Sequence, residues 1–225
     1  MAMNNLFIKK PTDNGLLTAS LNGQDRHAID TIFFRKRNGF FLDIGASDGV
    51  KENNSFLFEK YYDWNGICCE CDPRNIEKLC TNRMCHIFGS PIYKTTGLLV
   101  PFEMHKYEHL SGIAGYQSYR DISSKIVMLS TVSLMDCLRS CNAPKTIDYM
   151  SLDTEGTEFE ILSTVDFNEY KINYIAYEHN FQEPKRTNIR NILLTNGYAH
   201  FRSIANDDDY IYIPYATANN IQLPA

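Results

Sequence analysis

The stretch F-F-L-D-I-G-A-S-D-G-V-K-E-N-N-S, residues 40–55, is the most informative part of this sequence. It opens with a short apolar run, places two glycines four positions apart, and ends in a polar turn rich in asparagine. An apolar run that enters a glycine loop is typical of a buried strand followed by a turn and a helix. Glycines in such a loop let the backbone approach a ligand closely and adopt positive φ. The stretch therefore predicts a strand, a ligand-binding turn and the start of a helix.

Outward from this stretch, strands and helices alternate along the chain. Strands are expected over 40–46, 66–72, 84–92, 148–156 and 172–180. Helices are expected over 26–38, 55–64, 73–83, 131–142, 157–165 and 184–197. Residues 198–205 and 209–215 follow with no helix between them and predict a terminal antiparallel pair, with a turn at 206–209. The order predicts an α/β fold, a doubly wound, mostly parallel, seven-stranded Rossmann-like sheet with an antiparallel terminal strand.

Charge and cysteine content narrow the function classes. The net charge is −5 and the basic residues are scattered, so we expect no long nucleic acid as a partner. No run of about 18 apolar residues occurs, and the N-terminus lacks the apolar core of a signal peptide, so no membrane span is expected. Seven cysteines, without the spacing of a zinc site, predict reduced, packed thiols and a cytoplasmic, reducing compartment.

The residues that follow the predicted strands are the candidates for a binding site. In a doubly wound sheet, ligands lie outside the carboxyl ends of the strands. Four of the five groups at these ends contain carboxylates. The groups are 43–54, 70–72, 90–91, 153–155 and 178–180.

The composition of the glycine loop indicates which ligand it binds. A dinucleotide site needs G-x-G-x-x-G, but this loop has two glycines and carries Asp43 before it and Asp48 inside it. Carboxylates repel a pyrophosphate and suit a ligand with a cationic amino-acid head and a ribose. S-adenosylmethionine is such a ligand, and Glu70 at the end of the second strand can accept hydrogen bonds from its ribose hydroxyls. A plain turn capped by aspartate is the alternative interpretation of the loop.

On these residues the chain resembles the FkbM-type family of class I S-adenosylmethionine-dependent methyltransferases. The matching blocks, in order, are 23–25, 39–49, 53–55, 66–70, 147–158 and 175–179. The resemblance implies the class I methyltransferase fold and methyl transfer, often to a hydroxyl group in a sugar or glycan pathway. It also implies a sugar or glycan as methyl acceptor and a glycosyltransferase domain, fused or separate, as a partner in the pathway.

The resemblance assigns cofactor roles to individual residues. Asp43 and the two loop glycines would shape the methionine pocket, and Asn54 with Ser55 would hold the carboxylate at the helix start. Glu70 would bind the ribose. The complete candidate set for cofactor binding is Gln24, Asp43, Gly45, Ala46, Ser47, Asp48, Gly49, Asn54, Ser55, Glu70, Cys71, Ser90 and Asp153.

The domain organisation follows from the same resemblance. We expect an N-terminal extension over 1–25 that covers the cofactor, then a single methyltransferase domain over 26–225. The irregular stretch at about 93–123 is rich in tyrosine, lysine and histidine and is interpreted as an insertion that faces the acceptor.

Two acidic strand ends are the candidates for catalysis. Asp153 and Glu155 follow one strand, and Glu178 and His179 end its expected neighbour, so we predict these four residues as catalytic. A hydroxyl acceptor must lose its proton, and a carboxylate or histidine can act as the base. Alternatively a divalent metal, Mg²⁺ or Mn²⁺, held by Asp153, Glu178 and Asn180 would lower the pKa of the hydroxyl. The sequence leaves both routes open.

Simpler interpretations exist for several of these residues. Glu155 can cap the next helix, and His179 can be a structural histidine. Glu158 and Glu160 are expected to be solvated charges in the first turn of that helix.

The sequence favours an O-methyltransferase for a sugar or glycan hydroxyl. The alternatives are a methyltransferase for another small molecule, a protein or RNA, and a nicotinamide-dependent oxidoreductase. The oxidoreductase would need a third loop glycine, and an amino-methylating nucleic-acid enzyme usually carries an Asn/Asp-Pro-Pro-Tyr motif where this chain has Asp-Thr-Glu-Gly at 153–156.

Overall fold

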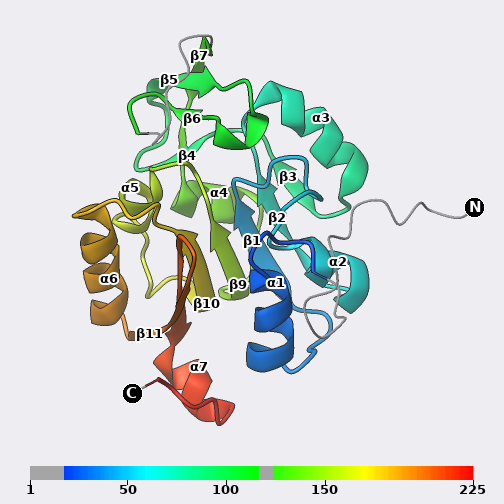
Figure 1. Ribbon diagram of the computed structural model, residues 1–225, viewed down its shortest axis with the longest axis vertical. Helices are drawn as coiled ribbons and strands as arrows, with labels where there is room; N and C mark the ends of the chain where they lie inside the picture. The colour runs from blue at the N-terminus through cyan, green and yellow to red at the C-terminus, as the bar shows by residue number, and fades with distance from the viewer. Residues whose placement is uncertain (1–17, 117–123, 225) are drawn as a thin grey trace, which may run out of the picture.

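A seven-stranded sheet forms the centre of the molecule (Figure 1). The computed structural model describes residues 18–116 and 124–224. The strand order is β11-β12-β10-β9-β1-β2-β3. The strands are β1 (Phe40–Ile44), β2 (Asn65–Cys69), β3 (His86–Phe88), β9 (Thr146–Leu152), β10 (Lys171–Glu178), β11 (Tyr198–Ile204) and β12 (Asp207–Tyr212). All neighbours pair in parallel except β12, which is antiparallel to both β10 and β11. The predicted doubly wound α/β fold is confirmed.

The last strand lies inside the sheet rather than at its edge. β12 inserts between β10 and β11, so the predicted terminal antiparallel pair is present with β11 at the edge. The predicted turn at 206–209 is wrong, because Asp207, Asp208 and Asp209 belong to β12 and are buried. Three consecutive acids are tolerated there because each has polar partners. Arg186 pairs with Asp208, and Arg202 pairs with Asp209.

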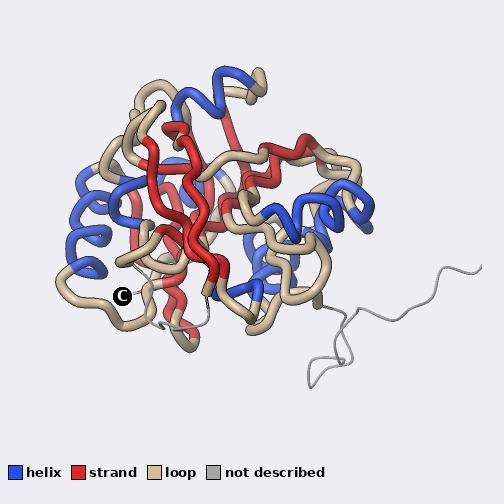
Figure 2. Tube along the Cα trace, turned by 90° about the horizontal axis from the view of Figure 1, so that it is seen from above, coloured by secondary structure: helices blue, strands red, loops and turns tan. Residues whose placement is uncertain are grey.

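Helices cover both faces of the sheet, as Figure 2 shows from above. The helices are α1 (Gln24–His27), the π-helix η1 (Ala28–Ile32), α2 (Phe56–Tyr62), α3 (Pro73–Asn82), α4 (Leu134–Ser140), α5 (Glu158–Leu162), α6 (Lys185–Thr195) and α7 (Ile213–Ala218). One apolar core unites Leu42 and Cys69 with side chains of α4, α5 and α6. The other unites Phe41 and Cys68 with side chains of η1, α2, α3 and α7. Alternate residues of a strand face opposite layers, as the period of two requires.

The first predicted helix ends earlier than expected. Helical structure stops at Ile32, and Phe34 and Arg35 have positive φ, so the predicted end at Gly39 is wrong. Gly39 instead makes room for Trp64, since a β-carbon at this glycine would lie 2.4 Å from the indole ring. The ring of Phe33 packs edge-on against the same indole, at 5.0 Å between centroids.

An insertion between β3 and α4 forms two small sheets. It contains β4 (Ile92–Tyr93), β5 (Leu99–Met104), the 3-10 helix η2 (Glu108–Leu110), β6 (Gly112–Ile113), β7 (Lys125–Ser130) and β8 (Val132–Ser133). The antiparallel sheet β6-β5-β7 lies at the top of Figure 1, beyond the main sheet. Arg74 at the start of α3 anchors this insertion by donating to Ser111 Oγ at 3.1 Å and to the His105 carbonyl at 2.8 Å. The stretch 117–123 of the predicted insertion lies outside the described residues, as do residues 1–17 of the predicted extension.

All seven cysteines are free, and four of them are buried. In the described part of the chain, no helix has the length and apolar character needed to cross a membrane.

Candidate functional site

A cavity of about 580 Å³ lies at the carboxyl ends of the central strands. A volume of this size suits a cofactor or another small molecule. The walls come from the glycine loop, the ends of β2, β9, β10 and β12, the insertion, and the segment before α1. Of the predicted cofactor residues, those that line the cavity are Gln24, Asp43, Gly45, Ala46, Ser47, Asp48, Asn54, Glu70, Cys71, Ser90 and Asp153. Gly49 and Ser55 are not part of the lining.

Gly45 brings the glycine loop against the end of β9. Its φ is +90°, and a β-carbon there would lie 1.7 Å from the carbonyl oxygen of Asp153. The backbone N–H groups of Gly45 and Ala46 both donate to the Cys69 carbonyl, at 2.9 and 3.1 Å. The ends of β1, β2 and β9 are therefore locked together, and only glycine fits at this junction.

Asp43 connects the end of β1 to the residues that follow the glycine loop. Its carboxylate is buried and accepts hydrogen bonds from Asn53 Nδ2 at 2.8 Å and from Ser55 Oγ at 2.6 Å. Burial raises the pKa of Asp43 despite these donors. The hydroxyl of Ser55 thus faces inward, whereas Asn54 lines the cavity and donates to Ser151 Oγ at 3.0 Å.

Arg83 is a positioning residue that sequence reasoning missed. Its side chain is completely buried, and it donates to the Gly49 carbonyl at 3.0 Å and to Asn53 Oδ1 at 2.9 Å. It also donates to Ser55 Oγ at 3.1 Å and pairs with Glu59 at 2.9 Å. A single arginine at the end of a helix carries no sequence signal for such a role, because its partners lie 24 to 34 residues earlier in the chain.

Glu70 lies just past the end of β2 and lines the cavity. One carboxylate oxygen accepts from the Ser47 N–H at 2.8 Å, and the other accepts from the N–H groups of Cys71 at 2.8 Å and Asp72 at 2.7 Å. Burial raises its pKa to about 7. A carboxylate has about four acceptor positions, so the three backbone donors orient Glu70 and leave capacity for a ligand hydroxyl.

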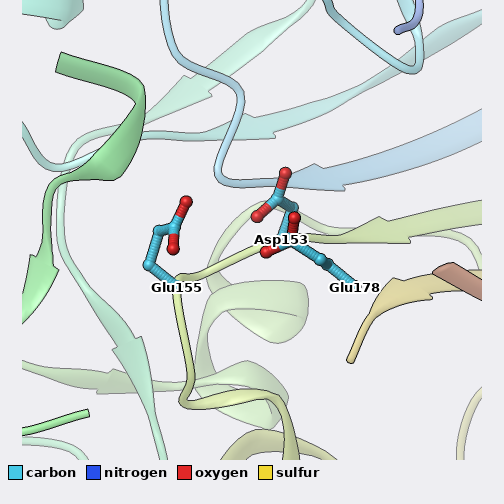
Figure 3. Close-up of side chains that lie close together, drawn as sticks. All are labelled: Asp153, Glu155 and Glu178. Carbon is cyan, nitrogen blue, oxygen red and sulfur yellow. The ribbon is translucent and has the colours of Figure 1, made fainter. Parts of the chain in front are cut away.

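Three carboxyl groups meet where β9 and β10 end (Figure 3). One oxygen from each of Asp153, Glu155 and Glu178 lies within 4.8 Å of the others. Asp153 and Glu178 are hydrogen-bonded to each other, which requires a shared proton. Burial first, and then the neighbouring carboxylates, raise the pKa of Asp153 strongly and the pKa values of Glu155 and Glu178 to about 8.

Carboxamides hold Glu178 in place. Asn206 Nδ2 donates to one of its oxygens and Asn180 Nδ2 donates to the other. The Asn180 oxygen in turn accepts from Asn206 at 3.0 Å. The carboxylates with metal-ligand spacing are the predicted Asp153 and Glu178 together with Glu155.

His179 does not line the cavity. Its Nδ1 accepts from the Phe181 N–H at 2.9 Å, and its Nε2 lies 3.8 Å from Asp208 on the side away from Glu178. Burial lowers its pKa. This geometry is that of a structural histidine which fixes the turn after β10.

Asp207 lines the cavity and was missed because the sequence suggested a turn. It stands opposite Glu178 in the β10–β12 register and accepts from Gln24 Nε2 at 2.6 Å and from Asn22 Nδ2 at 3.2 Å. Burial raises its pKa to about 6. The segment before α1 therefore reaches the acidic end of the cavity.

The prediction that Glu158 is solvated is wrong. It is 5% exposed, and its carboxylate accepts from the N–H groups of Thr154 at 2.8 Å and Gly156 at 3.1 Å. The turn that carries Asp153 and Glu155 wraps around this carboxylate, so Glu158 fixes the turn instead of facing water.

Comparison with known proteins identifies the family and the fold of this chain. The family model described as "Methyltransferase FkbM domain" matches residues 43–200. No curated protein matches the sequence. Among solved structures, the METTL16 MTase domain superposes with a TM-score of 0.50 at 12% identity, over 91% of this chain and 71% of that one. That similarity shows a shared fold.

Two further solved structures are similar at lower scores. Precorrin-6y C5,15-methyltransferase from Geobacter metallireducens has a TM-score of 0.45 at 12% identity, over 93% of this chain and 91% of that chain. A human methyltransferase 10 domain containing protein has a TM-score of 0.46 at 11% identity, over 87% of this chain and 83% of that chain.

Proposed function

This chain belongs to the FkbM methyltransferase domain family, and we propose that it uses S-adenosylmethionine to methylate a hydroxyl group of a sugar or glycan. Membership in a methyltransferase family removes the nicotinamide-dependent oxidoreductase from consideration. The proposal that the methyl acceptor is a hydroxyl group rests on the carboxyl cluster of Asp153, Glu155 and Glu178 beside the glycine loop.

The residues present fit S-adenosylmethionine. Glu70, oriented by three backbone N–H groups, would accept from the ribose hydroxyls. The glycine loop and Asn54 would enclose the methionine portion, and the cavity lacks the phosphate-binding loop of a dinucleotide site. When bound, the cofactor supplies an electrophilic methyl group.

The carboxyl cluster supplies the base. A hydroxyl group attacks an electrophile well only when its proton is removed as the new bond forms. Burial and mutual repulsion give Glu155 and Glu178 a pKa of about 8, so near neutral pH the cluster can both accept and retain a proton. The Asp153 carbonyl lies against Gly45, so the cluster borders the glycine loop, where the methionine portion of the cofactor would lie.

A divalent metal is the other route. Mg²⁺ or Mn²⁺ bound by the carboxyl cluster would polarise the hydroxyl instead. We favour the direct base because both oxygens of Glu178 already accept from carboxamides and Asp153 is hydrogen-bonded to Glu178. These bonds occupy positions that a hard cation would need.

The insertion supports a saccharide acceptor. Residues 106–113 line the cavity, and the rings of Tyr107 and His109 are stacked at 6.2 Å between centroids. Tyr107 is 56% exposed, and Lys106 Nζ lies 5.1 Å from the centre of its ring, so this segment presents aromatic and cationic groups to an acceptor. A protein, RNA or another small molecule is the alternative acceptor. A glycosyltransferase domain as the pathway partner stays a prediction.

Transfer of labelled methyl from S-adenosylmethionine tests the proposal. Acceptors would include free sugars, nucleotide sugars, short glycosides, peptides and RNA, each with and without a chelator. We expect label on a saccharide and no effect of the chelator. Label on peptide or RNA instead would refute the acceptor class, and loss of transfer with the chelator would refute the direct base.

A further inference from the structure

Glu155 is a buried carboxyl group without a hydrogen-bond partner among the described residues. It is 7% exposed, it lines the cavity, and its carboxylate has no hydrogen bond or ion pair within residues 18–116 and 124–224. The two other members of the cluster differ, since Glu178 accepts from Asn180 and Asn206 and is hydrogen-bonded to Asp153. Both oxygens of Glu155 are therefore available to a ligand.

The two side chains that cluster with Glu155 are carboxyl groups, and Lys185 donates to the neighbouring Gly156 carbonyl at 2.6 Å instead of to Glu155. Asp153 and Glu178 lie within 4.8 Å of it, and no described lysine, arginine or histidine forms an ion pair with any of the three. The carboxamides that hold Glu178 are neutral. A cation bound here would offset the repulsion among the three carboxyl groups and favour their ionised form, so this end of the cavity suits a cationic group supplied by a ligand.

The strand order separates this end from the cofactor end. Glu70 follows β2 and the glycine loop follows β1, whereas Glu155 and Glu178 follow β9 and β10 on the other side of β1. If the ribose lies at Glu70 and the methionine at the glycine loop, Glu155 faces the acceptor. An ammonium has three donors and needs only a few acceptors, whereas a divalent metal needs about six oxygen ligands.

We infer that the methyl acceptor carries a protonated amine, as an amino sugar does, and that Glu155 binds this ammonium group while the Asp153–Glu178 pair faces the neighbouring hydroxyl. This inference rests on the proposed function, because it specifies the acceptor of the same site. It makes Glu155 a specificity residue that selects an amine-bearing acceptor over its acylated or hydroxylated counterpart.

Binding to the protein saturated with S-adenosylhomocysteine tests the inference without turnover. The probes are methyl 2-amino-2-deoxyglucoside and its N-acetyl derivative, titrated by calorimetry at a pH at which the amine is protonated. We expect the amine to bind at least tenfold more tightly to the unaltered protein. Glu155→Gln should reduce that preference to less than threefold.

Glu169→Gln is the matched control. Glu169 pairs with Arg139 and Lys145 and does not line the cavity, so its removal should leave the amine preference intact. Thermal melting checks that both variants are folded. Equal affinity for the two probes, or a preference that persists in Glu155→Gln, would overturn the inference.

Three further outcomes are informative. Weaker binding of S-adenosylhomocysteine to Glu155→Gln, without an amine preference in the unaltered protein, would overturn the inference by assigning Glu155 to the cofactor's own ammonium. Mn²⁺ binding that depends on Glu155 and excludes the amine would overturn it in favour of a metal site. An amine preference without methyl transfer to any saccharide would uphold the cation site and refute the proposed function.

Discussion

Replacing Gly45 with alanine tests the junction between the glycine loop and the carboxyl cluster. The new β-carbon would lie 1.7 Å from the Asp153 carbonyl oxygen, so the two atoms must separate by at least 1.3 Å to reach the 3.0 Å limit of real contacts. The separation strains the hydrogen bond from the Asp153 N–H to the Ile44 carbonyl, now 2.9 Å. Loss of that bond costs about 1 kcal/mol, overpacking about 1–3 kcal/mol, and the positive φ about 1–2 kcal/mol.

Gly97→Ala is the control for this prediction. Gly97 has a φ of +85°, close to the +90° of Gly45, but a β-carbon there has no neighbour within 4 Å. Gly97→Ala therefore costs only the backbone strain of the positive φ. Gly45→Ala should be less stable than Gly97→Ala by roughly 2–4 kcal/mol. In a chain of this size that difference lowers the melting temperature by a further 5–15 °C, approximately. Urea denaturation of both variants measures it. Equal losses of stability would refute the close contact between β1 and β9.

Three other predictions concern the carboxylates. Glu70→Gln should weaken binding of S-adenosylhomocysteine by more than tenfold in calorimetry, because the amide has fewer acceptor positions for the ribose hydroxyls than the carboxylate has. Unchanged affinity would show that Glu70 does not bind the cofactor. Asp153→Asn should lower turnover by about 100-fold or more while melting at a similar temperature, and full activity would disprove the catalytic assignment. The pKa of Glu155 is raised to about 8 from 4.5, so the folded state binds its proton more tightly than the unfolded state does, and this residue's contribution to stability falls as pH rises from about 4.5 to 8. The melting temperature of Glu155→Gln, relative to the unaltered protein, should therefore increase between pH 5 and pH 8.5; a pH-independent difference would contradict the burial of this charge.

Local patterns were sufficient to predict the sheet and to bring the glycine loop and Glu70 to one cavity. Apolar runs that enter Asp43 and Glu70 identify parallel strands, and the carboxyl ends of such strands must meet at one edge of the sheet. The same rule brought Asp153 and Glu178 together, since β9 and β10 are neighbours. These positions depend on each residue's place at the end of its own strand, which the sequence reports directly.

Several of the errors came from charges whose partners are distant in sequence. Asp207–Asp209 resembled a solvated turn because three adjacent acids have no local compensation, yet Gln24, Arg186 and Arg202 supply it in the fold. Glu158 resembled a surface charge for a different reason, because its partners are close in sequence. Its donors are backbone N–H groups of the preceding turn, which a residue pattern does not display.

His179 and Asn180 illustrate a finer limit. Both follow β10 directly, so their positions in the sequence made them equally good candidates for the site. The left-handed backbone at Asn180 and Phe181, with φ of 44° and 54°, folds the turn back on itself. Asn180 then faces Glu178, and His179 faces Asp208 on the other side.

The most direct test of the central claim is the bond that the transferred methyl group makes. The protein would be incubated with ¹³C-methyl-labelled S-adenosylmethionine and the saccharide acceptors, and the products examined by carbon–proton correlation NMR. The carboxyl cluster predicts a methyl group bonded to oxygen, formed by the unaltered protein and not by Asp153→Asn. A methyl group bonded to nitrogen or carbon, or O-methyl product formed equally well by Asp153→Asn, would contradict the claim that Asp153 and its neighbours activate a hydroxyl.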